Sequence, residues 1–145
     1  MKVSIEVINK DQEEEICIRC HEVNKEIHQI ANQLKMNHSI LVGHEDDKIH
    51  QIKLRDIYYF EAVEGKVFIY CKDKVYEVKH KLYEIEEMHR GEKFFRASKS
   101  TIINITKISH ISPSFSGRFE AVLDNGERLM ISRKYVPDLK KILGL

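Results

Sequence analysis

The chain has 145 residues, of which 42% are hydrophobic and 32% charged, and its net charge is +1. This composition provides a core for about one folded domain and excludes an intrinsically disordered chain. No apolar run approaches the ~18 residues of a membrane-spanning helix, and the first residues lack the apolar stretch of a secretory signal. Because three cysteines, an odd number, argue against a disulfide framework, we expect a cytoplasmic protein without membrane insertion.

Charge is unevenly distributed along the chain. Residues 1–50 carry 6 Lys or Arg against 10 Asp or Glu, whereas residues 91–145 carry 10 against 5. Residues 93–119 contain five cations and no acid. A basic C-terminal part that follows an acidic N-terminal segment indicates a surface for a polyanion, and an ordinary solvated face is the alternative.

The first 45 residues predict a small β-β-α unit. Apolar residues alternate with polar ones over residues 3–7 and 16–20, which is typical of strands. From Val23 to Leu34 they recur at helical spacing, and Asn24 suits the N-cap because its side chain accepts a hydrogen bond from a free backbone N–H. One helix cannot bury this apolar stripe alone, so we expect it to pack on residues 1–20, on the β domain that follows or on a second copy.

The rest of the chain predicts a mainly β (α+β) fold. Segments rich in Ile, Val and Tyr alternate with turns, and Asn125-Gly126 is a strong hairpin signal because both residues tolerate positive φ. Pro137 suits the first turn of a helix, so the last helix begins near Val136, or begins after Ser132 and is disturbed at Pro137. The predicted strands are residues 39–43, 48–54, 57–61, 66–71, 74–78, 101–105, 107–111, 118–123 and 127–131, and a helix is predicted at 81–89.

The cysteines and histidines predict no cofactor site. Cys17 to His21 has the C-x-x-C-H spacing of a haem attachment site, but residues 17 and 20 of a strand point to opposite faces. A zinc site needs four convergent ligands, and Cys71 stands alone in the sequence. No nucleophile accompanied by a base and an orienting group is recognisable. We therefore expect no cofactor, no metal and no enzymatic activity.

Residues 93–104 combine two aromatics, a basic turn and a β-branched segment. Phe94 and Phe95 are adjacent in an extended stretch, so their side chains face opposite sides and at least one belongs to the core. Arg96 and Lys99 then lie near a rigid sheet edge, where they suit phosphate oxygens or guanine acceptors. A second polar cluster, residues 132–135, separates the last strand from the last helix.

Four blocks of the sequence stand out together. They are Asp56-Ile57-Tyr58-Tyr59-Phe60-Glu61, Phe94-Phe95-Arg96-x-x-Lys99-Ser100-x-Ile102-Ile103-Asn104, Asn125-Gly126 and Ser132-Arg133-Lys134-Tyr135. In order and spacing they resemble the LytTR family, the mainly β DNA-binding domains of bacterial transcription regulators. The resemblance covers about residues 48–143.

The resemblance implies an elongated antiparallel β-sheet fold that inserts loop side chains into successive major grooves of double-stranded DNA, often at paired repeats. It makes Lys99 and Lys134 candidates for base contacts. Lys66, Arg96 and Ser100 are candidates for contacts with the DNA backbone. The predicted DNA-binding set is Lys66, Arg96, Ser98, Lys99, Ser100, Ser132, Arg133 and Lys134.

The resemblance also predicts how the chain is divided into domains. Many family members carry a receiver domain ahead of the DNA-binding domain, whereas only about 45 residues precede it here, and a receiver needs roughly ~120. We therefore expect a stand-alone regulator with a β-β-α unit at residues 1–45 that is a possible dimer contact, and a DNA-binding domain at residues 46–145. The alternative is a protein-interaction module that keeps the fold and has lost DNA binding.

Overall fold

The computed structural model describes residues 1–89 and 93–145, without the side chains of residues 36–38. In these residues the helices are α1 (Lys25–His38), α2 (Leu82–Met88) and α3 (Val136–Leu143). The strands are β1 (Ile40–Glu45), β2 (Lys48–Lys53), β3 (Ile57–Val63), β4 (Lys66–Cys71), β5 (Val75–Val78), β6 (Phe94–Arg96), β7 (Thr101–Asn104), β8 (Ile108–Pro113), β9 (Phe119–Leu123) and β10 (Arg128–Ile131). The mainly β fold with short helices is confirmed.

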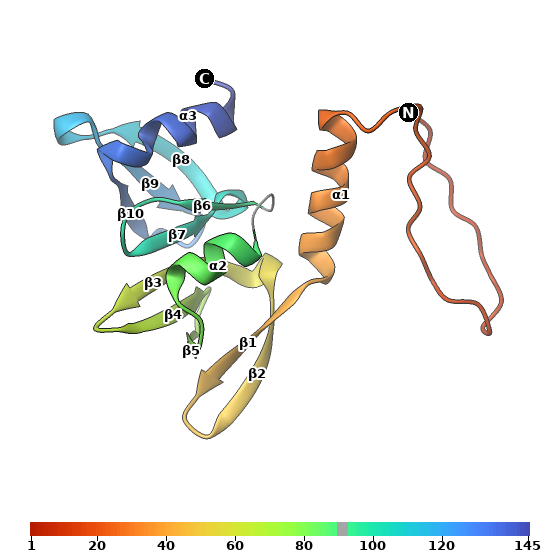
Figure 1. Ribbon diagram of the computed structural model, residues 1–145, viewed down its shortest axis with the longest axis horizontal. Coiled ribbons are helices and arrows are strands. Elements are labelled where there is room, and N and C mark those ends of the chain that lie inside the picture. The colour runs from red at the N-terminus through yellow and green to blue at the C-terminus, as the bar shows by residue number, and fades with distance from the viewer. Residues whose placement is uncertain (90–92) are drawn as a thin grey trace.

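The strands form two antiparallel sheets (Figure 1). Within the described residues the larger sheet has the order β2-β1-β5-β4-β3-β7-β6, and the smaller has the order β10-β9-β8. The hairpin predicted at Asn125-Gly126 joins β9 to β10, with Gly126 at φ 87° and Arg128 opposite Val122. The last helix begins at Val136 with Pro137 in its first turn, so the first of the two predicted starts is confirmed.

Two apolar cores form because β3 and β7 have a buried residue on both faces. Phe60 and Ile102 point into the first core, which α2 covers, whereas Tyr59 and Ile103 point into the second. The second core lies between β3, β6 and β7 on one side and the smaller sheet with α3 on the other. Members of the second core on those elements include Ala121, Leu123, Ile131, Val136 and Leu139.

Phe94 and Phe95 divide between the two cores, as the sequence predicts. Phe95 is 3% exposed and belongs to the second core. Phe94 is half-buried against the first core, where its ring lies edge-on to Phe60 at 5.4 Å between centroids. The short strand β6 therefore anchors both faces of the larger sheet immediately before the basic turn that follows it.

Polar side chains fix the junction between the sheets. The fully buried Asn104 donates from Nδ2 to the carbonyl of Ile57 at 2.7 Å, and its Oδ1 accepts from the backbone N–H and the hydroxyl of Thr106. Tyr59 donates its hydroxyl to Glu127 in the β9–β10 turn at 3.0 Å. Burial and the neighbouring Glu127 carboxylate raise the pKa of Tyr59, so this phenol stays protonated and keeps donating.

The N-terminal segment departs from the sequence prediction. Residues 1–24 contain no strand, so the β-β-α unit is wrong in its two strands, whereas the helix and its N-cap are confirmed by the 3.0 Å bond from the Ile27 N–H to the Asn24 side chain. An alternating pattern indicates which face of a strand would be buried, but it does not supply the neighbouring strand with which the backbone must pair. Val3, Ile5 and Val7 are accordingly 87–94% exposed.

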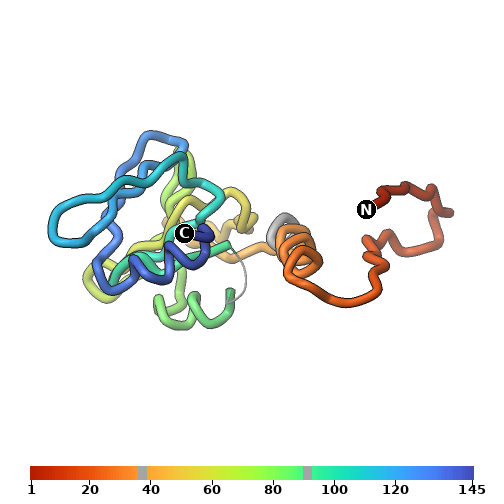
Figure 2. The backbone as a smooth tube through the Cα atoms, turned by 90° about the horizontal axis from the view of Figure 1, so that it is seen from above, coloured from red at the N-terminus to blue at the C-terminus, as the bar shows by residue number. Residues whose placement is uncertain are grey.

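Helix α1 partly buries its apolar stripe on the body of the protein. Ile27 is buried, Ile30 and Leu34 are half-buried, and α1 contacts β2 and the 3-10 turn Leu54–Asp56. Figure 2 shows the residues before α1 at one end of the molecule, away from both sheets.

β1 pairs with β2 and β5 in the larger sheet, and the division of the chain at residues 45/46 stays a prediction. No helix in the described residues is long and apolar enough to cross a membrane.

Candidate nucleic-acid interface

Three loops carry the residues that the sequence predicts to contact DNA. Loop 1 is the turn at residues 63–66, which includes the last residue of β3 and the first of β4. Loop 2 is residues 97–100 between β6 and β7, and loop 3 is residues 132–135 between β10 and α3. Figures 1 and 2 show all three on the side of the molecule that faces away from α1, with loop 2 between the other two in Figure 1. The fold thus brings segments from three parts of the chain to one side.

Loop 1 is a tight hairpin turn that ends in an exposed lysine. Glu64 and Gly65 both have positive φ, at 51° and 81°, as such a turn requires. The ammonium of Lys66 lies 3.8 Å from Glu77, which also pairs with Lys79 at 2.8 Å. The hydrogen bond from Lys79 lowers the pKa of Glu77, so this carboxylate is ionised at neutral pH and holds both lysines at the sheet surface.

Loop 2 is shaped by Arg96 at the end of β6. Its Nε donates to the carbonyl of Ser98 at 2.7 Å, and its Nη2 donates to the carbonyl of Lys99 at 2.7 Å. Its Nη1 pairs with Glu86 of α2 at 3.2 Å. All three guanidinium nitrogens are therefore engaged within the protein, and the sequence-based contact from Arg96 to the DNA backbone stays a prediction.

The tip of loop 2 presents Lys99 to solvent. The Ser98 hydroxyl accepts from the Ser100 N–H at 3.2 Å, so this serine helps to close the turn. The Lys99 side chain is exposed, and its ammonium has no hydrogen-bond or ion-pair partner in residues 1–89 and 93–145. A rigid turn with one free cation at its tip suits insertion into a groove.

Loop 3 is fixed to loop 2 through one carbonyl. The carbonyl of Ala97 accepts from the backbone N–H of Ser132 at 2.9 Å and from its hydroxyl at 3.1 Å. Ser132 is therefore half-buried and serves as a brace between the loops, whereas Arg133 and Lys134 are exposed. The Lys134 ammonium lies 5.3 Å from the centre of the Tyr135 ring, which restricts its position.

A backbone bond also joins loop 2 to the hairpin of loop 1. The N–H of Ala62 donates to the carbonyl of Ser100 at 2.8 Å, next to the β3–β7 pair Glu61–Thr101. Together with the bonds from Ser132, it makes the three loops one hydrogen-bonded unit. The lysines at positions 66, 99 and 134 are thus carried by a preorganised surface, which lowers the entropy lost when a partner binds.

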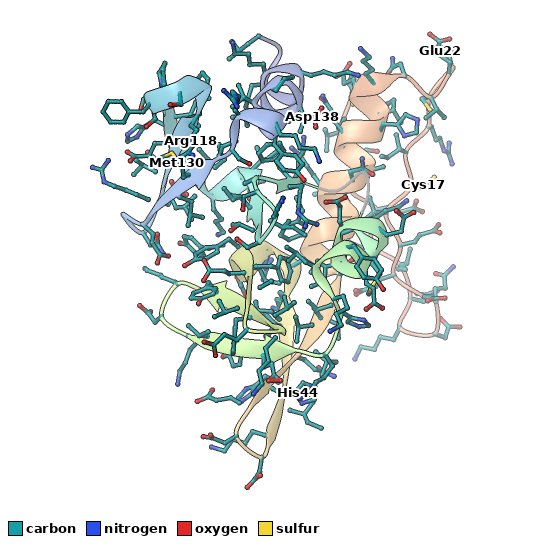
Figure 3. All side chains as sticks on the ribbon, turned by 60° about the vertical axis from the view of Figure 1, so that its left-hand side comes forward. Cys17, Glu22, His44, Arg118, Met130 and Asp138 are labelled. Atoms are coloured by element: carbon teal, nitrogen blue, oxygen red, sulfur yellow. The ribbon has the colours of Figure 1, made fainter. Side chains whose placement is uncertain are left out.

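Sequence reasoning missed a fourth basic segment beside loop 3. Ser116 and Arg118, between β8 and β9, line a cavity of about 580 Å³ together with Ser132, Arg133 and Lys134. Figure 3 shows Arg118 at the end of the molecule opposite His44 of β1. The available signal was the predicted hairpin at Asn125-Gly126, because its strands pair Phe119 with Ile131 and so bring Arg118 beside Ser132.

The cysteines and histidines form no compact metal-ligand cluster in the part of the chain that the structure describes, since no three His, Cys, Asp or Glu side chains come together there. Cys17 and Cys20 are exposed on the N-terminal segment, and Cys71 is half-buried in β4. Burial raises the pKa of the Cys71 thiol to about 11, so it is protonated and a poor nucleophile at neutral pH.

Comparison with known proteins assigns the class of this fold and surface. The LytTr DNA-binding domain family matches residues 47–144, which include β2 to β10, α3 and all three loops. The chain belongs to the LytTR family of DNA-binding domains, and the resemblance seen in the sequence is confirmed.

Relatives and a solved structure agree with this assignment. The chain is 33% identical to the sensory transduction protein LytT of Enterococcus faecalis over 69% of its own length and 41% of that protein. It is 28% identical to an uncharacterised HTH-type transcriptional regulator of Staphylococcus aureus over 100% of its length and 99% of that protein. A solved LytTr DNA-binding domain, from a Bacillus cereus protein named as a methyl-accepting/DNA response regulator, covers 74% of the chain with 27% identity and a TM-score of 0.70.

Proposed function

We propose that this chain is a bacterial transcription regulator that acts in the cytoplasm and reads double-stranded DNA by inserting its loops into successive major grooves. Loops 2 and 3 enter the two grooves with Lys99 and Lys134, and loop 1, on the other side of loop 2 in Figure 1, contacts the DNA backbone. The observation that carries the proposal is the hydrogen-bonded unit of three loops with exposed lysines at its surface. The match of a same-length transcriptional regulator supports the regulatory role.

The roles of the predicted residues follow from their partners. Lys99 and Lys134 present exposed ammonium groups from rigid turns, which suits contact with base edges. Lys66 is held at the surface by Glu77, and a point charge in that position suits a phosphate oxygen. Arg96 acts on DNA through the shape of loop 2, because its guanidinium is occupied by the two carbonyls that define the turn.

The contact from Lys66 to phosphate predicts a measurable change in salt dependence. Lys66→Ala is expected to weaken binding to every duplex by a similar factor and to flatten the slope of log affinity against log salt by ~1, because one fewer counterion is released. The measurement is a fluorescence anisotropy titration at several salt concentrations. Lys72→Ala, at the other end of β4, is the matched control and should leave the slope unchanged. An affinity that does not depend on salt would defeat the electrostatic interpretation.

The N-terminal segment supports a homodimer that places two chains on paired DNA repeats. Val3, Ile5 and Val7 expose almost their whole side chains, and apolar groups of this kind are buried when a partner is present. Two-fold association is the commonest way in which a chain covers such a surface, and two copies of the chain suit paired DNA repeats.

Sedimentation measurements test this dimer. The purified chain is expected to sediment as a dimer at concentrations of roughly 10–100 μM, well above a dissociation constant of about 1 μM for a moderate interface. Ile5→Glu combined with Val7→Glu should shift the population to monomer, because the interface would then bury two charges. Ile49→Glu, which replaces an exposed apolar residue of β2, is the control. A wild-type chain that is monomeric throughout this range would reject the dimer.

A further inference from the structure

The loop between β8 and β9 displays an aromatic ring that no core uses. Phe115 is 89% exposed, compared with 69% for Tyr83 of α2. The loop is nevertheless ordered by two backbone bonds, from Ser114 N–H to the Arg118 carbonyl at 2.8 Å and from Arg118 N–H to the Phe115 carbonyl at 3.2 Å. A defined turn that holds a phenyl ring in water suggests that the ring has a partner.

The backbone of this turn, residues 114–118 and hereafter loop 4, is locally strained. Ser116 has φ 57° and Gly117 has φ 75°, both in the left-handed region. For a residue with a side chain this conformation costs roughly 1–2 kcal/mol, and such strain persists where the surroundings impose it. The turn therefore holds the backbone at Phe115 in one conformation, with the side chain at the surface.

Loop 4 and loop 3 form one surface. A Cβ on Gly117 would lie 3.1 Å from Cδ and 3.3 Å from Cγ of Arg133, so glycine allows the two loops to approach closely. Between them lies the cavity of about 580 Å³ whose lining is Ser116, Arg118, Ser132, Arg133 and Lys134. Figure 1 shows loop 4 on the same side as loops 1 to 3, next to the start of α3.

The chemistry of this cavity selects an anion. Its lining has three cations and two hydroxyls and no carboxylate. The guanidinium groups of Arg118 and Arg133 have no ion-pair or hydrogen-bond partner among the described residues. Arginine and serine are preferred partners of phosphate oxygens, because guanidinium offers a planar fork of donors and the hydroxyl donates one more bond. An apolar ligand in this place would leave three charges without solvent or partner.

We propose that loop 4 is a fourth DNA contact, in which Arg118, Arg133 and Ser116 hold one backbone phosphate next to the groove entered by Lys134, while the Phe115 ring packs against the neighbouring deoxyribose. The inference rests on the proposed function, because it places the DNA strand beside loop 3. It extends the footprint beyond the three loops that the family resemblance assigns. It also gives the exposed ring and the basic cavity a single partner of matching chemistry.

The two parts of the contact differ in their dependence on salt, which makes them separable. Arg118→Ala removes a phosphate contact, so we expect about a tenfold loss of affinity and a salt slope shallower by ~1. Phe115→Ala removes a packing contact with no charge, so we expect a loss of about 3–10-fold with the slope unchanged. Arg128→Ala, whose arginine pairs with Glu120 on the same sheet, and Tyr83→Ala, whose ring is 69% exposed on α2, are the matched controls.

The experiment uses the full chain and a duplex that it selects from a random library. One duplex extends about 10 bp beyond the end of the site contacted by loop 3, and a second is cut at that end. The expected result is that both losses appear on the long duplex and disappear on the short one, with both controls binding like wild type and all variants unfolding at the same urea concentration. If wild type binds its selected site and either variant binds the long duplex equally well, the fourth contact is overturned and the proposed function stands.

Two further outcomes are decisive. If wild type itself retains no specific site, the proposed function fails, which is a different result from equal binding by the variants. If Phe115→Ala changes the sedimentation coefficient of the free protein, the ring is a protein–protein contact, and the proposal is overturned in favour of a second copy at this position.

Discussion

Lys99→Ala and Lys134→Ala are expected to relax base preference at two different positions of the DNA site. A base-edge contact contributes ~1–3 kcal/mol of discrimination, which corresponds to roughly 5–150-fold between the correct base and a wrong one. Each lysine stands on its own turn, and the two share no partner among the described residues, so the losses in the double variant should nearly add. The measurement compares the selected duplex with its single-base variants at one fixed salt concentration.

The same experiment separates base contacts from phosphate contacts. Lys72→Ala removes an exposed lysine outside the three loops and should leave base preference intact. A phosphate contact lowers affinity for all sequences by the same factor, whereas a base contact lowers it most for the preferred sequence. If both variants lose the same factor on every duplex, the two lysines touch only phosphate, and preference must arise from Arg133, Ser98 or the shape of the DNA.

Phe95→Ala is expected to lower the free energy of unfolding by ~3–5 kcal/mol, because it removes a buried ring and leaves a cavity in the second core. Phe95 is 3% exposed and packs in the cluster that contains Tyr59 and Ile103, so little room exists for the core to collapse into the space. The measurement is urea unfolding followed by circular dichroism. The expected loss is a large share of the 5–15 kcal/mol that stabilises a typical domain.

Phe115→Ala is the matched control for this result, because the same residue type is 89% exposed there. It should unfold at the same urea concentration as wild type. An unchanged midpoint for Phe95→Ala would show that β6 is not anchored in the second core, and the position of loop 2 would then be unsupported.

Much of the β fold is predictable from the sequence because its signals are local. Alternation fixes most strands to within one or two residues, and Asn125-Gly126 fixes a hairpin. The same alternation fails at residues 3–7 and 16–20, where no neighbouring strand completes the ladder. The sequence does not predict the division into two sheets, because that division depends on the buried side chain of Asn104 and on the turn that Thr106 helps to close.

The positions of the residues in the candidate site are predictable from the sequence, whereas the roles of those residues are less so. Resemblance placed the three loops, and the structure brings them together on one side. The engagement of Arg96 by two loop carbonyls depends on backbone geometry that no residue pattern reveals. Arg118 comes beside loop 3 because β9 and β10 pair with Phe119 opposite Ile131, a neighbourhood that the predicted hairpin at Asn125-Gly126 implies.

Selection of duplexes from a random library by the purified full chain tests the central claim most directly. If the three loops form one sequence-reading surface, the selected pool should share two conserved tracts about one helical turn of ~10 bp apart. The same selection with the Lys99→Ala, Lys134→Ala double variant should yield a pool with weaker or missing tracts. A wild-type pool that remains random in sequence, although bound, would contradict the account.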